Sequence, residues 1–340
     1  MASFSHYRVK HEHQVPDMTS DERPQETASF IEQLTRDLRI VITSLDENDI
    51  EFDLIGVDAS IANALRRIML AEVPTIAIEH VWIAVNNSII QDEVLAHRIG
   101  LIPIRADPSK LEYVQGEEMT DKDTLVFHFD VECSVLLHGE EEEVLNNRAL
   151  SGGLKWLPQG GQEEAFSEGV APVHDDIVVA KLKPGQRIEF EAHCRKGVGK
   201  DHTKYSPVAT ASYRLLPDIT VQNVVGAEAD ELVAMCPMKV FDIEDIGGGK
   251  KSKGGGGEYR AVAARPRDCT MCRECIRHPG WREKVLLRRK ADHFLFTVES
   301  TGCMPPQTVV REALSILKSK ASKFLGLVEE YEANGGAPGV

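Results

Sequence analysis

Four cysteines in the last third of the chain have the spacing of a metal site. Cys269, Cys272 and Cys275 form a C-x2-C-x2-C motif, and Cys236, which is followed by Pro237, lies upstream of it. In bacterial-type ferredoxins, a tight turn of this spacing supplies three thiolates to a four-iron cluster, and a distant Cys-Pro supplies the fourth. The four residues therefore predict a site for a single [4Fe–4S] cluster.

Two other interpretations of the motif stay open. One is an all-thiolate zinc site, although zinc sites more often use paired CxxC motifs; the other is a loop without metal. A second cluster is excluded, because Pro279-Gly280 stands where its Cys-Pro would have to be. Cys133, Cys194 and Cys303 are interpreted as small hydrophobic residues. Seven cysteines, an odd number in a large chain, favour a reducing compartment over a disulfide framework.

Composition and missing motifs exclude several other functions. The chain has 340 residues with a net charge of −15, whereas a protein that binds nucleic acid by itself needs clustered basic side chains. No apolar run approaches the roughly 18 residues that span a bilayer, so we expect an intracellular protein without membrane association. The sequence contains no HExxH, GxSxG or P-loop motif. We therefore predict that the chain itself catalyses no reaction.

Two strands and a helix are predicted near the start of the folded part. The run RIVITSLDENDIEFDLIGV from Arg39 suggests two strands that are joined by a turn at residues 46–49. The following SIANALRRIMLAEV predicts a helix. At about 100° per residue, Asn63, Arg66 and Arg67 share the face opposite its apolar residues. A polar face of this kind is usually only solvated.

The rest of the chain alternates between β-rich and flexible segments. Short β-rich runs between residues 74 and 209 predict antiparallel sheet. A strand is predicted again in ASYRLLPDITVQNVV, and a helix in AEADELVAMC. Residues 1–36 are predicted to be a flexible tail, and the Gly/Lys-rich residues 247–257 a flexible loop.

The strongest helix prediction begins at Pro305-Pro306, because proline suits the first turn of a helix. Apolar residues follow at alternating spacings of four and three, which is an a/d heptad seam. Such a seam packs on a partner helix or on the protein's own sheet, and the sequence alone makes the two alternatives comparable. The seam consists of Val310, Leu314, Leu317, Ala321, Phe324 and Val328.

Three segments of the chain resemble the alpha-like subunits of multisubunit DNA-directed RNA polymerases. They are DASIANALRRIMLAEVPTIAIEHV (58–81), DEVLAHRIGLIPIRAD (92–107) and DHTKYSPVATASYRLLPDI (201–219). Within that family, which includes archaeal D subunits and the bacterial alpha N-terminal domain, the chain is most similar to the large alpha-like subunit shared by eukaryotic polymerases I and III. The polymerase II subunit has a cysteine-rich zinc loop after HRxGLIPI, and the corresponding ADPSKLEYVQGEEMTDKDTL contains no cysteine. Some archaeal D subunits carry an iron–sulfur domain where Cys236 to Cys275 falls.

The resemblance implies an α+β fold, in which a discontinuous dimerisation domain is interrupted by an antiparallel β insert domain. On this chain the dimerisation domain corresponds to residues 37–73 and 210–332, and the insert domain to residues 74–209. A small ferredoxin-like, cysteine-containing insertion would occupy residues 230–283. Residues 333–340 would be a disordered end.

The resemblance also implies a function. Family members pair through helices with a second, smaller alpha-like subunit, so we expect the seam to be the heterodimer surface. The segment with Asn63, Arg66 and Arg67 would contact the two largest subunits. The chain itself would not bind nucleic acid, which would contact other parts of the complex. The chain would then be a non-catalytic assembly platform for rRNA, 5S rRNA and tRNA transcription in the nucleus and nucleolus. The alternatives are an archaeal-type or polymerase II alpha-like subunit, or an Fe–S electron-transfer module.

Overall fold

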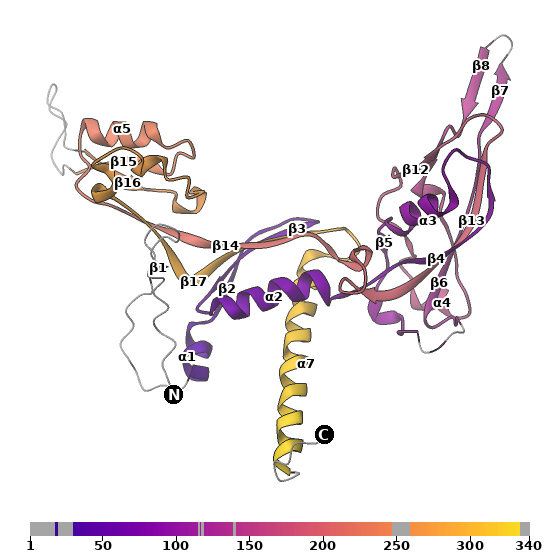
Figure 1. Ribbon diagram of the computed structural model, residues 1–340, viewed down its shortest axis with the longest axis horizontal. Coiled ribbons are helices and arrows are strands. Elements are labelled where there is room, and N and C mark those ends of the chain that lie inside the picture. Colours follow the sequence, from indigo (N-terminus) through magenta and orange to yellow (C-terminus); the bar gives the residue numbers. More distant parts are fainter. Residues whose placement is uncertain are drawn as a thin grey trace. The chain divides into compact units, whose positions relative to one another are not determined.

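The computed structural model describes residues 18–19, 30–114, 116, 119–138, 141–246 and 259–333 (Figure 1). The predicted Gly/Lys loop lies outside these residues, as do most of the predicted tail and the predicted disordered end beyond residue 333. Although the predicted tail extends to residue 36, helix α1 (Phe30–Asp37) forms at its end. The apolar residues of α1 have helical spacing, but eight residues are too few for that periodicity to stand out.

The chain divides by its internal contacts into two compact units, each assembled from separate stretches. The first unit combines Phe52–Ala62 and Tyr213–Phe296 with the chain up to Val41. The second combines Ile42–Glu51 and Asn63–Ser212 with the chain from Thr297 onward. The predicted boundaries of the dimerisation and insert domains stay predictions.

One sheet has five strands, which are β1 (Met18–Thr19), β2 (Arg39–Leu45), β3 (Asp49–Ile55), β14 (Val208–Val221) and β17 (Val285–Ser300). Their order is β1-β17-β3-β2, and β14 also pairs with β17. The predicted strands on either side of residues 46–49 are β2 and β3. The β-rich runs VLLRRK and HFLFTVES, each long enough for a strand of its own, lie on one continuous strand, β17.

Helix α2 (Ala59–Ala71) is the helix predicted from SIANALRRIMLAEV. It begins after Asp58, whose Oδ1 accepts the backbone N–H of Ser60 at 2.8 Å, as an N-cap side chain does. Leu65 and Met69, one turn apart, are at most 2% exposed. Burying a side chain of this size stabilises the fold by about 1.5–3 kcal/mol. The face of α2 that carries the apolar residues is therefore the face that packs against the rest of the protein.

The chain between residues 74 and 209 forms antiparallel sheet, as predicted. The strands of its main sheet are β4 (Pro74–Asn86), β6 (Thr124–Glu132), β10 (Lys155–Leu157) and β13 (Arg187–Val198). Their order is β10-β6-β13-β4, and every neighbouring pair is antiparallel. Phe127 and Phe129 of β6 are fully buried, in one cluster with Leu95 of helix α3 (Asp92–Gly100).

Shorter elements complete this region. Its two-stranded antiparallel ladders are β5 (Ile104–Arg105) with β11 (Ala171–Pro172), β7 (Ser134–His138) with β8 (Glu141–Leu145), and β9 (Arg148–Leu150) with β12 (Val178–Lys181). Helix α4 (Gln162–Ala165) is a single turn.

The segment that carries the four cysteines has small elements and a hydrophobic cluster of its own. The elements are α5 (Ala227–Met235), the antiparallel pair β15 (Phe241–Asp245) and β16 (Tyr259–Ala263), and α6 (Trp281–Lys284). Leu232, Phe241 and Trp281 belong to the cluster and are at most 7% exposed. The ferredoxin-like character of this insertion stays a prediction.

Helix α7 (Pro306–Ala333) is the predicted C-terminal helix. Val309 and Ala313 in its first half are fully buried. From Lys318 to the end of the helix, every residue except Gly326 is exposed. No helix in the described part of the chain is both long enough and apolar enough to cross a membrane.

Candidate functional site: two helix faces and a cysteine cluster

The polar face of α2 is the first predicted contact surface. Arg66 donates hydrogen bonds from Nε and Nη2 to Asn63 Oδ1, at 3.2 and 2.9 Å. Arg67 is exposed, and its side chain forms no hydrogen bond or ion pair with another described residue. The structure therefore brings Asn63 and Arg66 together and leaves the Arg67 guanidinium in solvent. A role of the three residues in subunit contact stays a prediction.

The predicted seam on α7 is mostly left uncovered by the described residues. The chain's own packing uses a neighbouring stripe of the helix, at Val309 and Ala313. The large side chain of Phe324 is 67% exposed, in a half of the helix where no stripe is buried. Along the seam, Val310 and Leu317 are half-buried, and Leu314, Ala321, Phe324 and Val328 are exposed.

The apolar face of α7 is wider than the heptad seam. Leu325 and Leu327 flank the seam and are 61% and 55% exposed, and Tyr331, which continues the seam by three residues, is 53% exposed. An a/d pattern marks only a narrow line along a helix, whereas a broader contact adds the positions beside it. Counting those positions in the sequence would have found Leu325 and Leu327, and continuing the seam by one step would have found Tyr331.

A single ion pair joins the middle of α7 to the chain that follows α2. Lys320 Nζ lies 2.5 Å from Glu72 Oε1. The two side chains are 53% and 32% exposed, and exposed pairs contribute only about 0–1 kcal/mol. The pair therefore adds little to the stability of α7 and leaves the apolar residues beyond it uncovered.

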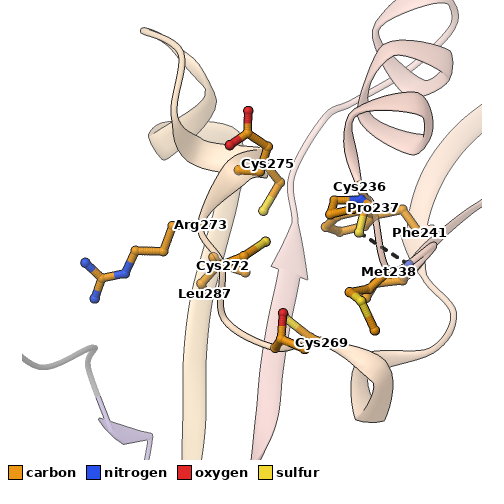
Figure 2. A pocket seen from close by; sticks show the side chains of 12 residues that line it. Cys236, Pro237, Met238, Phe241, Cys269, Cys272, Arg273, Cys275 and Leu287 are labelled. Atoms are coloured by element: carbon orange, nitrogen blue, oxygen red, sulfur yellow. Dashed lines mark hydrogen bonds between the residues drawn. The ribbon is translucent and has the colours of Figure 1, made fainter.

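The four predicted cysteine ligands line one pocket, as Figure 2 shows. Cys236 follows the end of α5, and the other three lie in residues 266–276, which we call the cysteine loop. Cys275 is buried and Cys272 is exposed, so the pocket opens to solvent on one side. The structure thus brings Cys236 into the same pocket as the three cysteines of the motif, from which it is distant in the sequence.

The backbone around the pocket has two left-handed residues and donates hydrogen bonds to two of the cysteine sulfurs. Met271 and Arg273 have φ angles of 56° and 63°, a left-handed conformation that non-glycine residues adopt rarely and at a cost. The Met271 N–H donates to Cys269 Sγ at 3.4 Å. The Val240 N–H donates to Cys236 Sγ at 3.5 Å. Two of the four sulfurs therefore already accept backbone hydrogen bonds that would stabilise them as thiolates.

Burial in the pocket favours the neutral form of two of the thiols. Burial, and then the neighbouring cysteines, raise the pKa of the Cys275 thiol to about 12. Burial likewise raises the pKa of Cys269. Thiolates at these positions would repel one another, so the two groups are neutral thiols near pH 7 as long as no cation binds beside them.

The spacing of the sulfurs bears on the kind of group. A tetrahedral zinc holds its sulfurs at about 2.3 Å and hence about 3.8 Å from each other. Among the described residues, no three cysteine sulfurs lie within 4.8 Å of one another. The four sulfurs are therefore not arranged as a bound zinc would hold them. The identity of the group stays a prediction.

The other three cysteines behave as small hydrophobic residues, as the sequence indicates. Cys133, Cys194 and Cys303 are all buried. Burial raises the pKa of Cys194 and Cys303 above the ordinary thiol range. They are not candidates for ligand chemistry.

Side chains from the polymerase-like segments form hydrogen bonds within the antiparallel sheet region of residues 74–209. Arg98, in HRIGLIPI, donates to the carbonyls of Val178 and Val179 at 2.7 and 3.1 Å and so braces β12. Tyr205, in DHTKYSP, donates from its hydroxyl to Glu79 Oε2 at 2.9 Å. These side chains serve the packing of the region.

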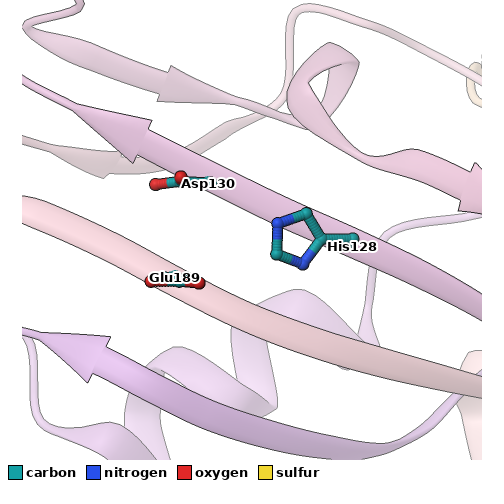
Figure 3. Close-up of side chains that lie close together, drawn as sticks. All are labelled: His128, Asp130 and Glu189. Atoms are coloured by element: carbon teal, nitrogen blue, oxygen red, sulfur yellow. The ribbon is translucent and has the colours of Figure 1, made fainter.

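A group of three ligand-type side chains lies on the exposed face of the β6-β13 pair (Figure 3). The ligand atoms of His128, Asp130 and Glu189 lie within 4.8 Å of one another. Arg187 already contacts both carboxylates, at 2.8 Å from Asp130 and 2.9 Å from Glu189. Its hydrogen bond is the main cause that lowers the pKa of Asp130. We interpret the group as an ion-pair cluster that is complete without a metal.

A mixed α/β chain with antiparallel sheets and a long apolar helix face in solvent is the kind of protein that associates with another through that helix. The model of the RNA polymerase Rpb3/Rpb11 dimerisation domain matches residues 51–321, and the chain belongs to this family.

Relatives place the chain more finely. The RPAC1 subunit of DNA-directed RNA polymerases I and III from Bos taurus is 46% identical over 304 residues, which cover 86% of this chain and 85% of that protein. The RPAC1 subunit from Saccharomyces cerevisiae is 40% identical over 86% of this chain and 88% of its own length. The rpb3 subunit of RNA polymerase II from Dictyostelium discoideum is 31% identical over 88% of this chain and 98% of its own length. The resemblance to polymerase alpha-like subunits, and to the form shared by polymerases I and III, is confirmed.

Proposed function

We propose that this chain is the large alpha-like subunit shared by DNA-directed RNA polymerases I and III, and that it is a non-catalytic assembly platform. The observation that carries the proposal is 40–46% identity to such subunits over at least 86% of the chain. Nucleotidyl transfer would belong to the two largest subunits, which this chain holds in place. Nucleic acid would contact the complex and not this chain, whose net charge is −15. We further propose that the protein acts in the nucleus and nucleolus.

The partner on α7 would be the small alpha-like subunit. The exposed Phe324, Leu325 and Leu327 give the helix an apolar face that the described chain does not cover. A fully buried side chain of this type contributes about 1.5–3 kcal/mol, part of which offsets the entropy lost on association. Several such residues on one helix suffice for a stable heterodimer. We accordingly assign residues 37–73 and 210–332 to the dimerisation domain and residues 74–209 to the insert domain.

The partner on α2 would be the pair of largest subunits. The Asn63–Arg66 hydrogen bonds hold one guanidinium in a fixed orientation, and Arg67 presents a second one to solvent. A planar guanidinium with five donors suits an interface with carboxylates and carbonyls. This face has little apolar surface, so its contacts would differ in kind from those of α7.

Co-purification tests the proposal and separates the two surfaces. Tagged full-length chain should recover the small alpha-like subunit and the largest subunits of polymerases I and III, as identified by mass spectrometry. Leu317→Asp should lose the small subunit, whereas Arg66→Glu with Arg67→Glu should keep it and lose the largest subunits. Arg277→Glu, at a side chain that is 70% exposed, is the matched control. Recovery of polymerase II subunits alone, or of no polymerase subunit, would refute the assignment.

For the cysteine pocket we propose a single [4Fe–4S] cluster that has a structural role. Cys236, Cys269, Cys272 and Cys275 would hold it, and the cluster would supply a rigid cross-link among the small elements of the segment. Anaerobically purified chain should contain iron and acid-labile sulfide in equal amounts, with a broad absorbance near about 400 nm. Cys272→Ser should abolish both, and Cys303→Ser should not. Zinc in place of iron and sulfide, or protein without metal, would contradict the proposal.

A further inference from the structure

An ion pair between a buried carboxylate and a partly exposed guanidinium joins the cysteine loop to two strands of the five-stranded sheet. Asp53, on β3, has a side chain that is only 8% exposed. Its two oxygens accept hydrogen bonds from Arg267, from Nη1 at 2.7 Å and from Nη2 at 2.8 Å. His293, on β17, lies with Nε2 at 2.9 Å from the same carboxylate. The three residues belong to one compact unit.

Arg267 is part of the turn that leads into the cysteine ligands. The turn is a short 3-10 helix, Pro266–Asp268, and the N–H of Cys269 donates to its first carbonyl at 3.2 Å. The carbonyl of Arg267 accepts a further hydrogen bond from Arg214 Nη1 of β14, at 2.6 Å. A two-pronged Arg–carboxylate contact fixes orientation as well as distance. The position of Cys269 is therefore set from the sheet.

The cysteine loop contains strained backbone that a fixed contact has to restrain. Met271 and Arg273 keep left-handed φ angles, and residues in that region persist only where the surroundings constrain them. Cys272, between them, is exposed and adds little packing. Arg267 lies at the start of the loop. Its contact with Asp53 therefore restrains the strained backbone that follows it.

We infer that Asp53 is the positioning residue of the cysteine loop, and that the Asp53–Arg267 pair couples the cysteine pocket to strands β3 and β17. The inference rests on the proposed function and deepens it, because it names how the pocket would stabilise the sheet of an assembly subunit. Coupling between two sites is reciprocal. A thiophilic ion in the pocket therefore slows the opening of β3, and loss of the ion pair removes that effect.

Thiol reactivity in the full-length chain tests the positioning role. After removal of metal with EDTA, iodoacetamide labelling of each cysteine is followed by mass spectrometry. Asp53→Asn keeps the shape of the side chain and removes its charge. It should raise the labelling rates of Cys269 and Cys275 by about tenfold or more, because charge-assisted hydrogen bonds that restrain the loop are lost. Unchanged rates at these two cysteines would overturn the inference.

The buried cysteines outside the pocket distinguish a local from a global effect. Cys133 and Cys194 should keep their wild-type rates in Asp53→Asn, and a parallel rise there would show general unfolding and overturn the inference. Arg267→Gln alone would leave the buried Asp53 carboxylate with only His293 beside it, and removing one partner of a buried charge can unfold a protein. The double variant Asp53→Asn with Arg267→Gln therefore serves as the second test. Arg260→Gln, which removes an ion pair whose members are both more than half exposed, is the control.

Hydrogen–deuterium exchange tests the coupling. Cd²⁺, a thiophilic probe, should slow amide exchange in β3 of the wild-type chain and should leave exchange in Asp53→Asn unchanged. Equal slowing in both chains, or no slowing in the wild type, would overturn the coupling. The proposed function fails on a different readout, namely the absence of polymerase subunits from the co-purified material, so the two failures are distinguishable.

Discussion

Replacing Phe324 by alanine should weaken the heterodimer without weakening the chain itself. The Phe324 side chain is 67% exposed, so about two-thirds of its apolar surface is available to a partner. Full burial of a phenylalanine contributes about 1.5–3 kcal/mol, and two-thirds of that is about 1–2 kcal/mol. Since about 1.4 kcal/mol corresponds to a tenfold change, Phe324→Ala should raise the Kd for the small alpha-like subunit by about five- to thirtyfold.

Isothermal titration calorimetry with purified small alpha-like subunit measures this change. The free energy of unfolding of the isolated chain should change by less than about 0.5 kcal/mol, because an exposed side chain stabilises little. Lys323→Ala, at the adjacent exposed position and off the apolar face, should change the Kd by less than about twofold. If Phe324→Ala bound as tightly as wild type, the apolar face of α7 would not be the heterodimer surface.

Three other changes test the folded state. Phe129→Ala should lower the free energy of unfolding by about 3–5 kcal/mol in urea titrations, because this fully buried ring fills the core of the insert region. Gly56→Ala should also destabilise, by about 1–3 kcal/mol, because Gly56 has a φ of +78° and a Cβ there would lie 2.2 Å from the Asp37 carbonyl oxygen. Burial raises the pKa of Glu79, but the hydrogen bond from Lys204 helps to bring the net pKa below its ordinary 4.5. The stability it contributes is therefore present above pH 4.5 and is lost as the pH falls through the lowered folded-state pKa, so the difference in unfolding free energy between wild type and Glu79→Gln should shrink in acid.

Features with a local signature were predictable from the sequence. Helix α2 has a capping aspartate, apolar residues at helical spacing and a proline that follows it. All three signals lie in the single segment from Asp58 to Pro74. The cysteine loop is marked by spacing alone, because three cysteines within seven residues form a recognisable pattern whatever they bind. Both depend on neighbours in the chain and need no knowledge of the tertiary structure.

Features that depend on distant contacts were not predictable. Asp53 and Arg267 are 214 residues apart, and neither has a motif around it that points to the other. On α7 the heptad pattern indicated an apolar face, but which stripe the chain buries for itself, at Val309 and Ala313, depends on the packing of the second unit. The same holds for Arg187, whose two ion pairs make the cluster on the β6-β13 pair complete without metal.

The two proposed contact surfaces differ in chemistry, and the difference has a consequence for the order of assembly. The α7 surface is apolar over its exposed half, and exposed apolar surface of this kind is prone to aggregation unless a partner covers it. The α2 surface is polar and tolerates water, because Asn63 and Arg66 satisfy each other and Arg67 is solvated. Pairing through α7 should therefore precede contact through α2: the chain first gains a permanent partner on its apolar helix, and the arginine face then selects the larger subunits by directional hydrogen bonds.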